Sequence, residues 1–204
     1  MRPGKIVCVG RNYAAHAREL GNPVPERPLL FFKPSSAIVH DGEAIVLPPE
    51  SSRVEHEAEI GVIVGRPLRR ADAAEARRAI AAIVPANDVT ARDLQKTDGQ
   101  WVRAKGFDTF CPLGAPVPIA PDLDLAGLEI VGRVNGQVRQ HGRATDMAFA
   151  IPDLLAYISG IMTLDAGDLV LTGTPEGVGP LAPGDTVTVE IPGYGAVTNP
   201  VRSA

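Results

Sequence analysis

The chain has 204 residues, of which 45% are hydrophobic and 22% charged, an ordinary composition for a globular domain with its own core. The net charge is −4, the longest basic runs are arginine pairs and no apolar stretch is long enough for a membrane span, which argues against nucleic-acid and membrane partners. Nineteen prolines and 21 glycines, against five Phe, three Tyr and one Trp, exclude a helical bundle and favour short strands joined by tight turns.

In the first half of the chain, the pattern predicts a strand at 6–9 and a short helix at 13–20 that ends at Gly21. Residues 22–28 carry three prolines and form an irregular loop. Strands are expected at 29–33 and 44–47 around a turn at Asp41-Gly42. The next elements are a long strand at 55–64, a helix capped by Asp72 that reaches about residue 82, a strand at 83–89 and a helical turn at 91–95.

In the second half, Asn135-Gly136 between the segments 128–134 and 137–140 is the strongest hairpin signal in the chain. A second helix is expected at 145–159, followed by strands at 169–171, 186–191 and 195–201. The elements together predict an α+β fold that is rich in short, mostly antiparallel strands.

The cysteines and the first residues bear on location. Cys8 and Cys111 form no CxxC motif, which is typical of buried, reduced thiols in a cytosolic protein. Residues 1–5 lead directly into a strand, without the apolar core of a secretion signal. We therefore expect a cytoplasmic protein in which residues 1–204 form one domain.

An acidic cluster opens the strand expected at 55–64. Alternate side chains of a strand share a face, so Glu55, Glu57 and Glu59 should point the same way, with neighbours about 6.6 Å apart. Carboxylates at that separation can converge on one hard cation. The alternative is a solvated edge strand that uses charge against aggregation. The residues that follow, 60–64, are apolar and of the kind found in a buried strand. Carboxylates next to such a strand repel each other and require a partner cation.

Two further charged residues stand at the ends of apolar segments. Asp88 ends the strand expected at 83–89, where it can supply a third oxygen ligand or cap the helical turn that follows. Lys105 lies between apolar neighbours, where a cation can neutralise a developing enolate or bind a carboxylate. A surface lysine that buries only its stem is the alternative.

His16 and Glu19 lie three residues apart on the first predicted helix, and therefore on one face of it. A carboxylate that fixes the tautomer of an imidazole and raises its basicity makes a base able to activate water. An unrelated surface pair is the alternative. The proline-rich loop at 22–28 favours the interpretation as a catalytic base, because a loop that covers an active site and excludes water often lies next to such a base.

The segment 171–179 has three glycines after a strand, as in a phosphate-binding loop. No lysine follows and no helix begins there, so we reject a nucleotide site. The Thr174 hydroxyl and the backbone N–H groups of the turn can still face a small anion, with an ordinary exit from a strand as the alternative.

These motifs occur in an order that resembles the fumarylacetoacetate hydrolase family, over nearly the whole chain from about Lys5. The matching segments are Asn12-Tyr13-x-x-His16-x-x-Glu19, Glu57-x-Glu59, Asp88-x-x-Ala91-Arg92-Asp93-x-Gln95, Ala104-Lys105-Gly106-x-Asp108 and Gly167-Asp168 with Thr172-Gly173-Thr174-Pro175-x-Gly177-Val178-Gly179. The resemblance implies the family's mixed β-roll with a few short helices. It also implies a bound Mg²⁺, with Mn²⁺ or Ca²⁺ in some members, a small keto-acid or enol-acid substrate and a homodimer.

The resemblance assigns roles residue by residue. It makes Glu57, Glu59 and Asp88 the metal ligands and leaves Glu55 out. His16 and Glu19 become the catalytic dyad that handles water or a proton, and Lys105 joins them. The substrate contacts implied, besides Lys105, are Arg92, Gln95 and Thr174.

Two departures from the larger family members point to the single-domain branch, which contains acylpyruvases and oxaloacetate decarboxylases. No separate N-terminal domain is recognised, and Gly10-Arg11-Asn12 offers no counterpart to a further acidic ligand. The expected activity is Mg²⁺-dependent hydrolysis of a carbon–carbon bond in acylpyruvates such as fumarylpyruvate, with decarboxylation of oxaloacetate beside it. The alternatives are a 2-hydroxyhepta-2,4-diene-1,7-dioate isomerase of aromatic-acid breakdown and a non-catalytic metal-binding relative.

Overall fold

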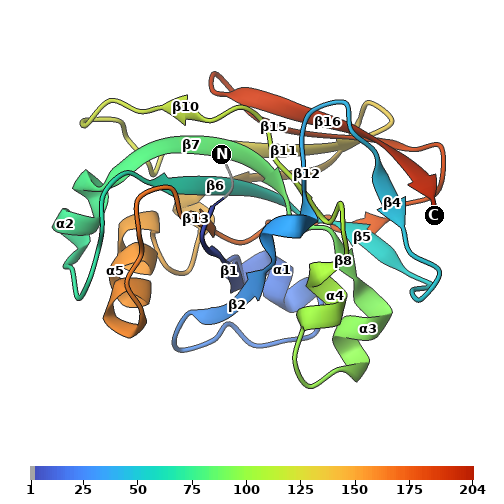
Figure 1. Ribbon diagram of the computed structural model, residues 1–204, viewed down its shortest axis with the longest axis horizontal. Coiled ribbons are helices and arrows are strands. Elements are labelled where there is room, and N and C mark those ends of the chain that lie inside the picture. Colours follow the sequence, from blue (N-terminus) through green and yellow to red (C-terminus); the bar gives the residue numbers. More distant parts are fainter. Residues whose placement is uncertain (1–2) are drawn as a thin grey trace.

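A six-stranded sheet forms the centre of the computed structural model, which describes residues 3–204 (Figure 1). In spatial order its strands are β10 (Val117–Pro118), β7 (Ile80–Asn87), β6 (Ala58–Val64), β13 (Leu169–Leu171), β1 (Ile6–Gly10) and β2 (Leu29–Lys33). β1 and β13 are parallel, and the other neighbours are antiparallel. β6 and β7 are buried over most of their length, which explains why both are apolar on both faces.

A five-stranded sheet packs against the central one and lies above it in Figure 1. Its order is β12 (Gln137–Arg143), β11 (Glu129–Val134), β15 (Thr186–Ile191), β16 (Gly195–Ser203) and β4 (Ile45–Leu47). The hairpin predicted at Asn135-Gly136 is confirmed: both residues have positive φ, 52° and 77°, and they join β11 to β12.

Shorter strands and helices complete the α+β, β-rich fold that the sequence predicts. The remaining strands are β5 (Val54–His56) between β14 (Gly179–Pro180) and β8 (Thr90–Ala91), and β3 (Ile38–Val39) beside β9 (Cys111–Pro112). The helices are α1 (Ala14–Glu19), α2 (Ala73–Arg78), α3 (Arg92–Thr97), α4 (Val102–Gly106) and α5 (Ile151–Ile161). Short 3₁₀ turns occupy Ser35–Ala37 and Ala144–Asp146.

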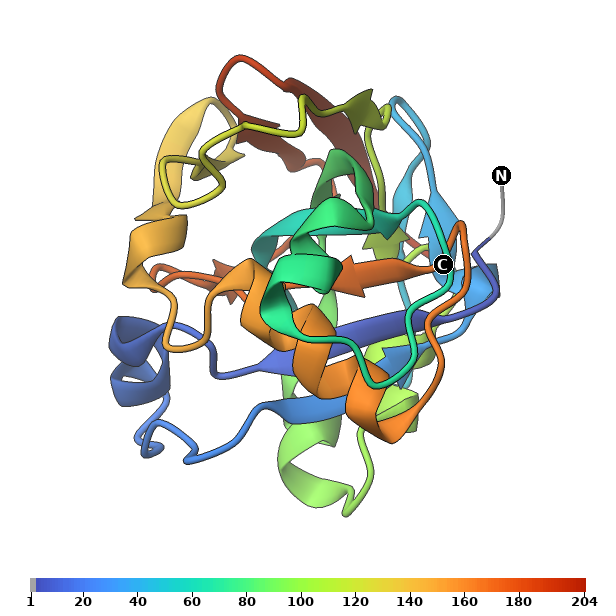
Figure 2. The same cartoon turned by 90° about the vertical axis from the view of Figure 1, so that its left-hand side faces the viewer.

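The helices gather at the two ends of the central sheet. α2 and α5 pack on each other at one end, beside the largest apolar cluster of the described residues (Figure 2). That cluster also takes in Ile60 and Val62 of β6 and Val189 of β15, so it lies between the two sheets. α1, α3 and α4 lie toward the other end, where β6 begins and β7 ends (Figure 1). No helix within residues 3–204 is long and apolar enough to cross a membrane.

Four expectations about these elements differ from the structure. The strand expected at 55–64 is two strands, because β5 pairs with β8 and β14 whereas β6 joins the central sheet. The segments 29–33 and 44–47 form no hairpin: β2 pairs with β1, and β4 pairs with β16. The helix capped by Asp72 ends at Arg78, because the chain enters β7 at Ile80. The helix expected at 145–159 begins only at Ile151.

Candidate metal-binding active site

Three buried carboxylates meet where β6 begins and β7 ends. Glu57 lies at the junction of β5 and β6, Glu59 is the second residue of β6, and Asp88 follows β7. The pairing of Ala58 with Asn87 aligns the two strands so that the backbone N–H of Asp88 donates to the Glu57 carbonyl, at 2.9 Å. One oxygen of each carboxylate lies within 4.8 Å of the others. This cluster is the set of residues that the resemblance names as metal ligands.

The chain balances the charge of Glu57 but leaves that of Glu59 without a basic partner. Burial works against the charge of Glu57, but Lys105 and Arg92 outweigh it and lower the pKa of this carboxyl. Burial and the nearby Asp88 and Glu57 raise the pKa of Glu59 well above its ordinary value. Within residues 3–204, no basic side chain forms a salt bridge with Glu59, which accepts a hydrogen bond from the Gly173 N–H at 2.8 Å. A hard divalent cation with oxygen ligands fits this donor set, since it would supply a positive partner for the Glu59 carboxylate.

Two buried lysines contact oxygens of Glu57 and Asp88. Lys105 Nζ, on α4, lies 3.0 Å from Glu57 Oε2 and 2.6 Å from Asp88 Oδ2. Lys33 Nζ, at the end of β2, lies 2.8 Å from Asp88 Oδ1 and donates to the carbonyls of Val89 and Lys105. No sequence pattern singled out Lys33, because a lysine at the end of an apolar run is usually a surface residue. The structure brings it to the cluster by pairing β2 with β1.

Glu55 belongs to a different arrangement from Glu57 and Glu59. Its carboxylate accepts from Arg92 Nε at 2.7 Å and from Arg53 Nε at 2.6 Å. The same Arg92 guanidinium donates to Glu57 Oε1 and to Gln95 Oε1. The break between β5 and β6 separates Glu55 from the other two acids, so the shared face expected from a continuous strand is wrong.

The predicted dyad forms on α1. His16 Nδ1 lies 3.2 Å from Glu19 Oε2, and Glu19 Oε1 accepts from the backbone N–H of Gly177 at 3.0 Å. Because an ionised carboxylate only accepts hydrogen bonds, Nδ1 of His16 is the donor in this pair, and the neutral imidazole with that tautomer has its acceptor at Nε2. Asn12 anchors the helix: its amide donates to the carbonyls of Phe149 and Thr172, at 3.1 and 2.8 Å.

One cavity brings the motifs together. Of the predicted site residues, all but Glu19 and Asp88 line it; these two lie behind His16 and Lys105. Several further lining residues have no role predicted from the sequence, among them Arg11, Phe31 and Trp101. The rings of Phe31 and Trp101 meet edge to face at 5.2 Å, and Lys105 Nζ lies 4.8 Å from the Phe31 ring centroid. The cavity therefore combines carboxylates, cations and an aromatic wall.

Residues 5–202 match the family model described as the C-terminal region of fumarylacetoacetate (FAA) hydrolase. The chain belongs to the fumarylacetoacetate hydrolase family. Among its relatives, the mitochondrial oxaloacetate tautomerase of Arabidopsis thaliana is 46% identical over 95% of this chain and 88% of the relative. The oxaloacetate tautomerase YcgM of Escherichia coli strain K12 is 45% identical, over 95% and 91%. The mitochondrial oxaloacetate decarboxylase of Dictyostelium discoideum is 44% identical, over 93% and 89%.

Solved structures of the family have the same fold. The 2-hydroxyhepta-2,4-diene-1,7-dioate isomerase of Mycobacterium marinum is 46% identical, with a TM-score of 0.89 over 100% of this chain and 76% of that one. The fumarylpyruvate hydrolase of Pseudomonas aeruginosa, in complex with Mn²⁺ and pyruvate, is 29% identical, with a TM-score of 0.92 over 99% and 91%. The fumarylacetoacetate hydrolase-like β-roll expected from the resemblance is therefore confirmed. The named relatives include tautomerases, a decarboxylase, an isomerase and a hydrolase.

Proposed function

We propose that this family member is a divalent-metal-dependent enzyme that stabilises the enolate of a small 2-keto acid. One observation carries the proposal: Glu57, Glu59 and Asp88 converge beside the His16–Glu19 dyad, and no basic side chain of the described residues pairs with Glu59. The Mn²⁺ in the Pseudomonas aeruginosa fumarylpyruvate hydrolase supports a divalent cation. We propose Mg²⁺ as the native ion, since it prefers a few carboxylates and keeps positions for substrate and water.

The residues of the cavity divide the work. Glu57, Glu59 and Asp88 would hold the ion, which when bound supplies Lewis-acid stabilisation of negative charge on substrate oxygens. Lys105 brings a fixed positive charge to the same place. Arg92, Gln95 and Thr174 line the cavity and would position the substrate.

The reaction that we propose first is hydrolysis of an acylpyruvate. His16, held by Glu19, takes a proton from water at Nε2 while the water oxygen attacks the distal carbonyl carbon. The bond between that carbon and the methylene of the pyruvate portion then breaks. Its electron pair passes to the pyruvate portion, which leaves as an enolate and is protonated to pyruvate, and the acyl portion leaves as a carboxylic acid.

A second candidate is tautomerisation or decarboxylation of oxaloacetate, because relatives at 44–46% identity carry those names. Here no water attacks, and the site moves a proton or releases CO₂. Arg11 bears on the size and charge of the substrate rather than on the choice of reaction, since it lines the cavity and forms no salt bridge within residues 3–204. A free guanidinium there suits the distal carboxylate of oxaloacetate, and equally that of fumarylpyruvate or a dienedioate.

The test is to assay acetylpyruvate, fumarylpyruvate, oxaloacetate and a 2-hydroxy-dienedioate with Mg²⁺, with Mn²⁺ and with EDTA. We expect turnover that requires the metal, and we expect Glu57→Ala and Asp88→Ala to abolish it. Exposed Asp122→Ala serves as the control, with unchanged rates. Full activity in EDTA would overturn the metal-dependent account. Tight Mg²⁺ binding without turnover of any keto acid would point instead to the non-catalytic relative.

A further inference from the structure

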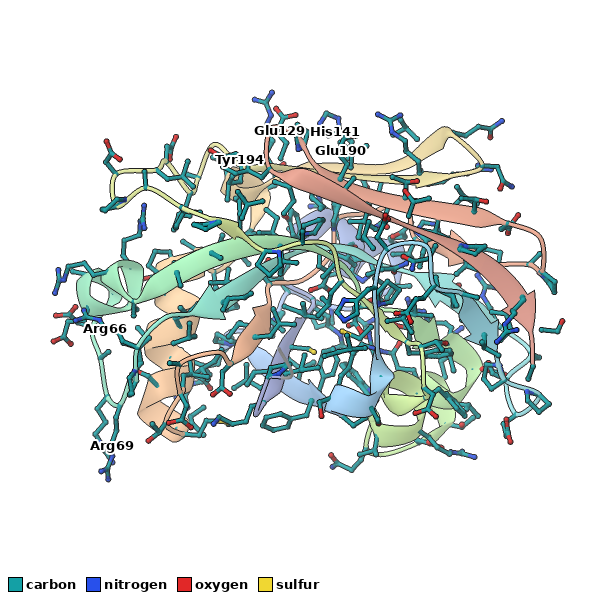
Figure 3. The ribbon with its side chains drawn as sticks, turned by 45° about the horizontal axis from the view of Figure 1, so that its top comes forward. Arg66, Arg69, Glu129, His141, Glu190 and Tyr194 are labelled. Carbon is teal, nitrogen blue, oxygen red and sulfur yellow. The ribbon has the colours of Figure 1, made fainter. Side chains whose placement is uncertain are left out.

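Gln140 carries a buried amide that no step of the proposed reaction uses. It lies on β12 and is 1% exposed. Its neighbour His141 points outward from the same strand toward Glu129, which it meets at 3.1 Å (Figure 3). Alternate residues of a strand face opposite sides, so Gln140 points into the fold, toward the cavity wall. A polar side chain buried this deeply requires partners.

All the main hydrogen-bonding positions of the Gln140 amide are occupied. Oε1 accepts from His56 Nδ1 at 3.0 Å and from the Ala58 N–H at 2.9 Å. Nε2 donates to Thr174 Oγ1 at 2.7 Å and to the Pro175 carbonyl at 2.8 Å. The Ala58 N–H can only donate and the Pro175 carbonyl can only accept, so these two partners fix the orientation of the amide.

Two of these partners flank Glu57. His56 ends β5 and Ala58 begins β6, so Gln140 Oε1 bridges the point where the chain leaves one sheet and enters another. Glu57 itself belongs to neither strand, and its backbone N–H donates to Asn87 Oδ1 at 2.9 Å. The direction in which the Glu57 carboxylate points therefore depends on side-chain contacts across the junction.

The other two partners belong to the turn that carries Thr174. The Thr174 hydroxyl accepts from Gln140 and lies 2.9 Å from the Ala58 carbonyl, to which it donates. The turn rests on β12 again at Gly177, where a Cβ would lie only 2.0 Å from the Arg139 carbonyl. The N–H of Gly177 holds Glu19 of the dyad. β12 thus supports both the Thr174 hydroxyl and the partner of His16.

We propose that Gln140 is a positioning residue that sets Thr174 and Glu57 relative to each other. The inference rests on the proposed function, because the roles of Thr174 and Glu57 are assigned there. Gln140 acts through hydrogen bonds to the backbone beside Glu57 and to the hydroxyl of Thr174, and it touches no substrate itself.

The first experiment is a double-mutant cycle on kcat/KM with Gln140→Met and Thr174→Ala. Gln140→Met keeps the length of the side chain and removes all four hydrogen bonds. We expect each single variant to lose about 10- to 100-fold, the range for hydrogen bonds of this kind. The double variant should lose clearly less than the product of the two single losses, because the two substitutions share the Thr174 hydroxyl while Gln140→Met also acts beside Glu57. Losses that multiply would overturn the link to Thr174. Gln137→Met, exposed on the same strand, should match the wild type.

The second experiment measures Mn²⁺ binding by calorimetry, without substrate. Gln140→Met should weaken Mn²⁺ binding several-fold because Glu57 loses its support. Gln140→Glu keeps the two acceptor contacts beside Glu57, loses the two donor contacts and adds a negative charge, so it should not weaken Mn²⁺ binding while kcat/KM falls. If Gln140→Met does not fold, Gln140→Glu alone decides between these outcomes. Unchanged Mn²⁺ affinity in a folded Gln140→Met, or weakened affinity in Gln140→Glu, would overturn the link to Glu57.

The two experiments also separate this proposal from the proposed function. A wild-type protein that binds Mn²⁺ but turns over no keto acid contradicts the proposed function alone. The calorimetric comparison of the Gln140 variants still tests the link between Gln140 and Glu57 in that case.

Discussion

Two halves of the cavity balance their carboxylates differently. On the side of α3 and α4, Glu57 faces Arg92 and Lys105, and its pKa is lowered in spite of burial. Two residues along the chain, Glu59 lies beside the turn at Gly173 with no basic partner, and its pKa is raised. In the first half, side chains of the protein itself balance the charge of Glu57. In the second half, no basic side chain of residues 3–204 forms a salt bridge with Glu59, and a divalent cation fits the carboxylate cluster there.

The largest expected effect concerns His16, the general base of the proposed hydrolysis. His16→Ala should lower acylpyruvate hydrolysis by about 10²- to 10⁴-fold, the contribution typical of a general base. Decarboxylation of oxaloacetate needs no attacking water and should fall much less. Steady-state rates on both substrates with saturating Mg²⁺ provide the measurement. Equal losses on the two substrates would mean that His16 does not serve to activate water.

The next prediction compares the two carboxylates directly, in the metal-free protein. Glu57→Gln should lower the free energy of unfolding by about 2 kcal/mol, because Arg92 and Lys105 each lose one of their buried charged partners and keep only Glu55 and Asp88. Glu59→Gln should instead raise it by about 1 kcal/mol, because it removes a buried carboxyl whose ionisation is disfavoured by burial and by Asp88 and Glu57. Urea denaturation in EDTA measures both values. With saturating Mg²⁺, the wild type should become more stable than Glu59→Gln, because ion binding adds more to the free energy of unfolding when all three carboxylates are present. Loss of stability in both variants would contradict the contrast.

A smaller effect should appear at Arg11. Arg11→Met should lower kcat/KM by about 10-fold for substrates with a distal carboxylate, the value of one hydrogen bond between charged groups. Acetylpyruvate has no distal carboxylate and provides the matched control, with an unchanged rate. The comparison requires only initial rates on acetylpyruvate and fumarylpyruvate. A similar loss on both would assign Arg11 to the keto-acid end of the substrate.

The smallest effect is the pH dependence of Asp93, which lies in the first turn of α3 in the cation-rich half. Burial works against its charge, but hydrogen bonds from Ser51 and Ser52 outweigh it and hold the pKa at about 2, below the ordinary 3.8. Because the pKa of Asp93 is lower in the folded protein than in the unfolded chain, its ionisation stabilises the fold at pH values above the ordinary pKa of 3.8. This contribution is lost as the pH falls toward 2. Asp93→Asn should therefore cost less than about 1 kcal/mol near neutral pH, given its exposure, and less still in acid. Urea titrations at several pH values measure the trend, with Asp122→Asn as the control. If Asp93→Asn destabilised the protein more in acid than at neutral pH, the predicted direction of the pH dependence would be wrong.

The sequence predicts the chemistry of the site better than its supports. The acids, the dyad and Lys105 stand in motifs whose order resembles one family, and they line or adjoin one cavity in the structure. Glu55 has other neighbours than expected, because alternation assumes an unbroken strand and cannot reveal the break at Glu57. Lys33 and Gln140 lie in segments predicted correctly as strands. Their roles depend on which distant segment each strand packs against, and local patterns do not contain that information.

The strand pairings show the same limit. The hairpin at Asn135-Gly136 was predictable, because two residues with positive φ specify it locally. β2 and β4 are close in sequence, yet they pair with β1 and β16, which the turn at Asp41-Gly42 cannot encode. The native ion, the cytoplasmic location, the homodimer and the single domain stay predictions.

The lysines beside Asp88 have a consequence for ion selectivity. Lys33 and Lys105 already occupy oxygens of Asp88 and Glu57, so an incoming ion competes with two ammonium groups for the same electron pairs. A monovalent ion such as Na⁺ or K⁺ offers no more charge than the ammonium that it would displace. A small divalent ion offers twice the charge at a shorter distance. We therefore expect the two lysines to favour small divalent ions over alkali ions at this cluster.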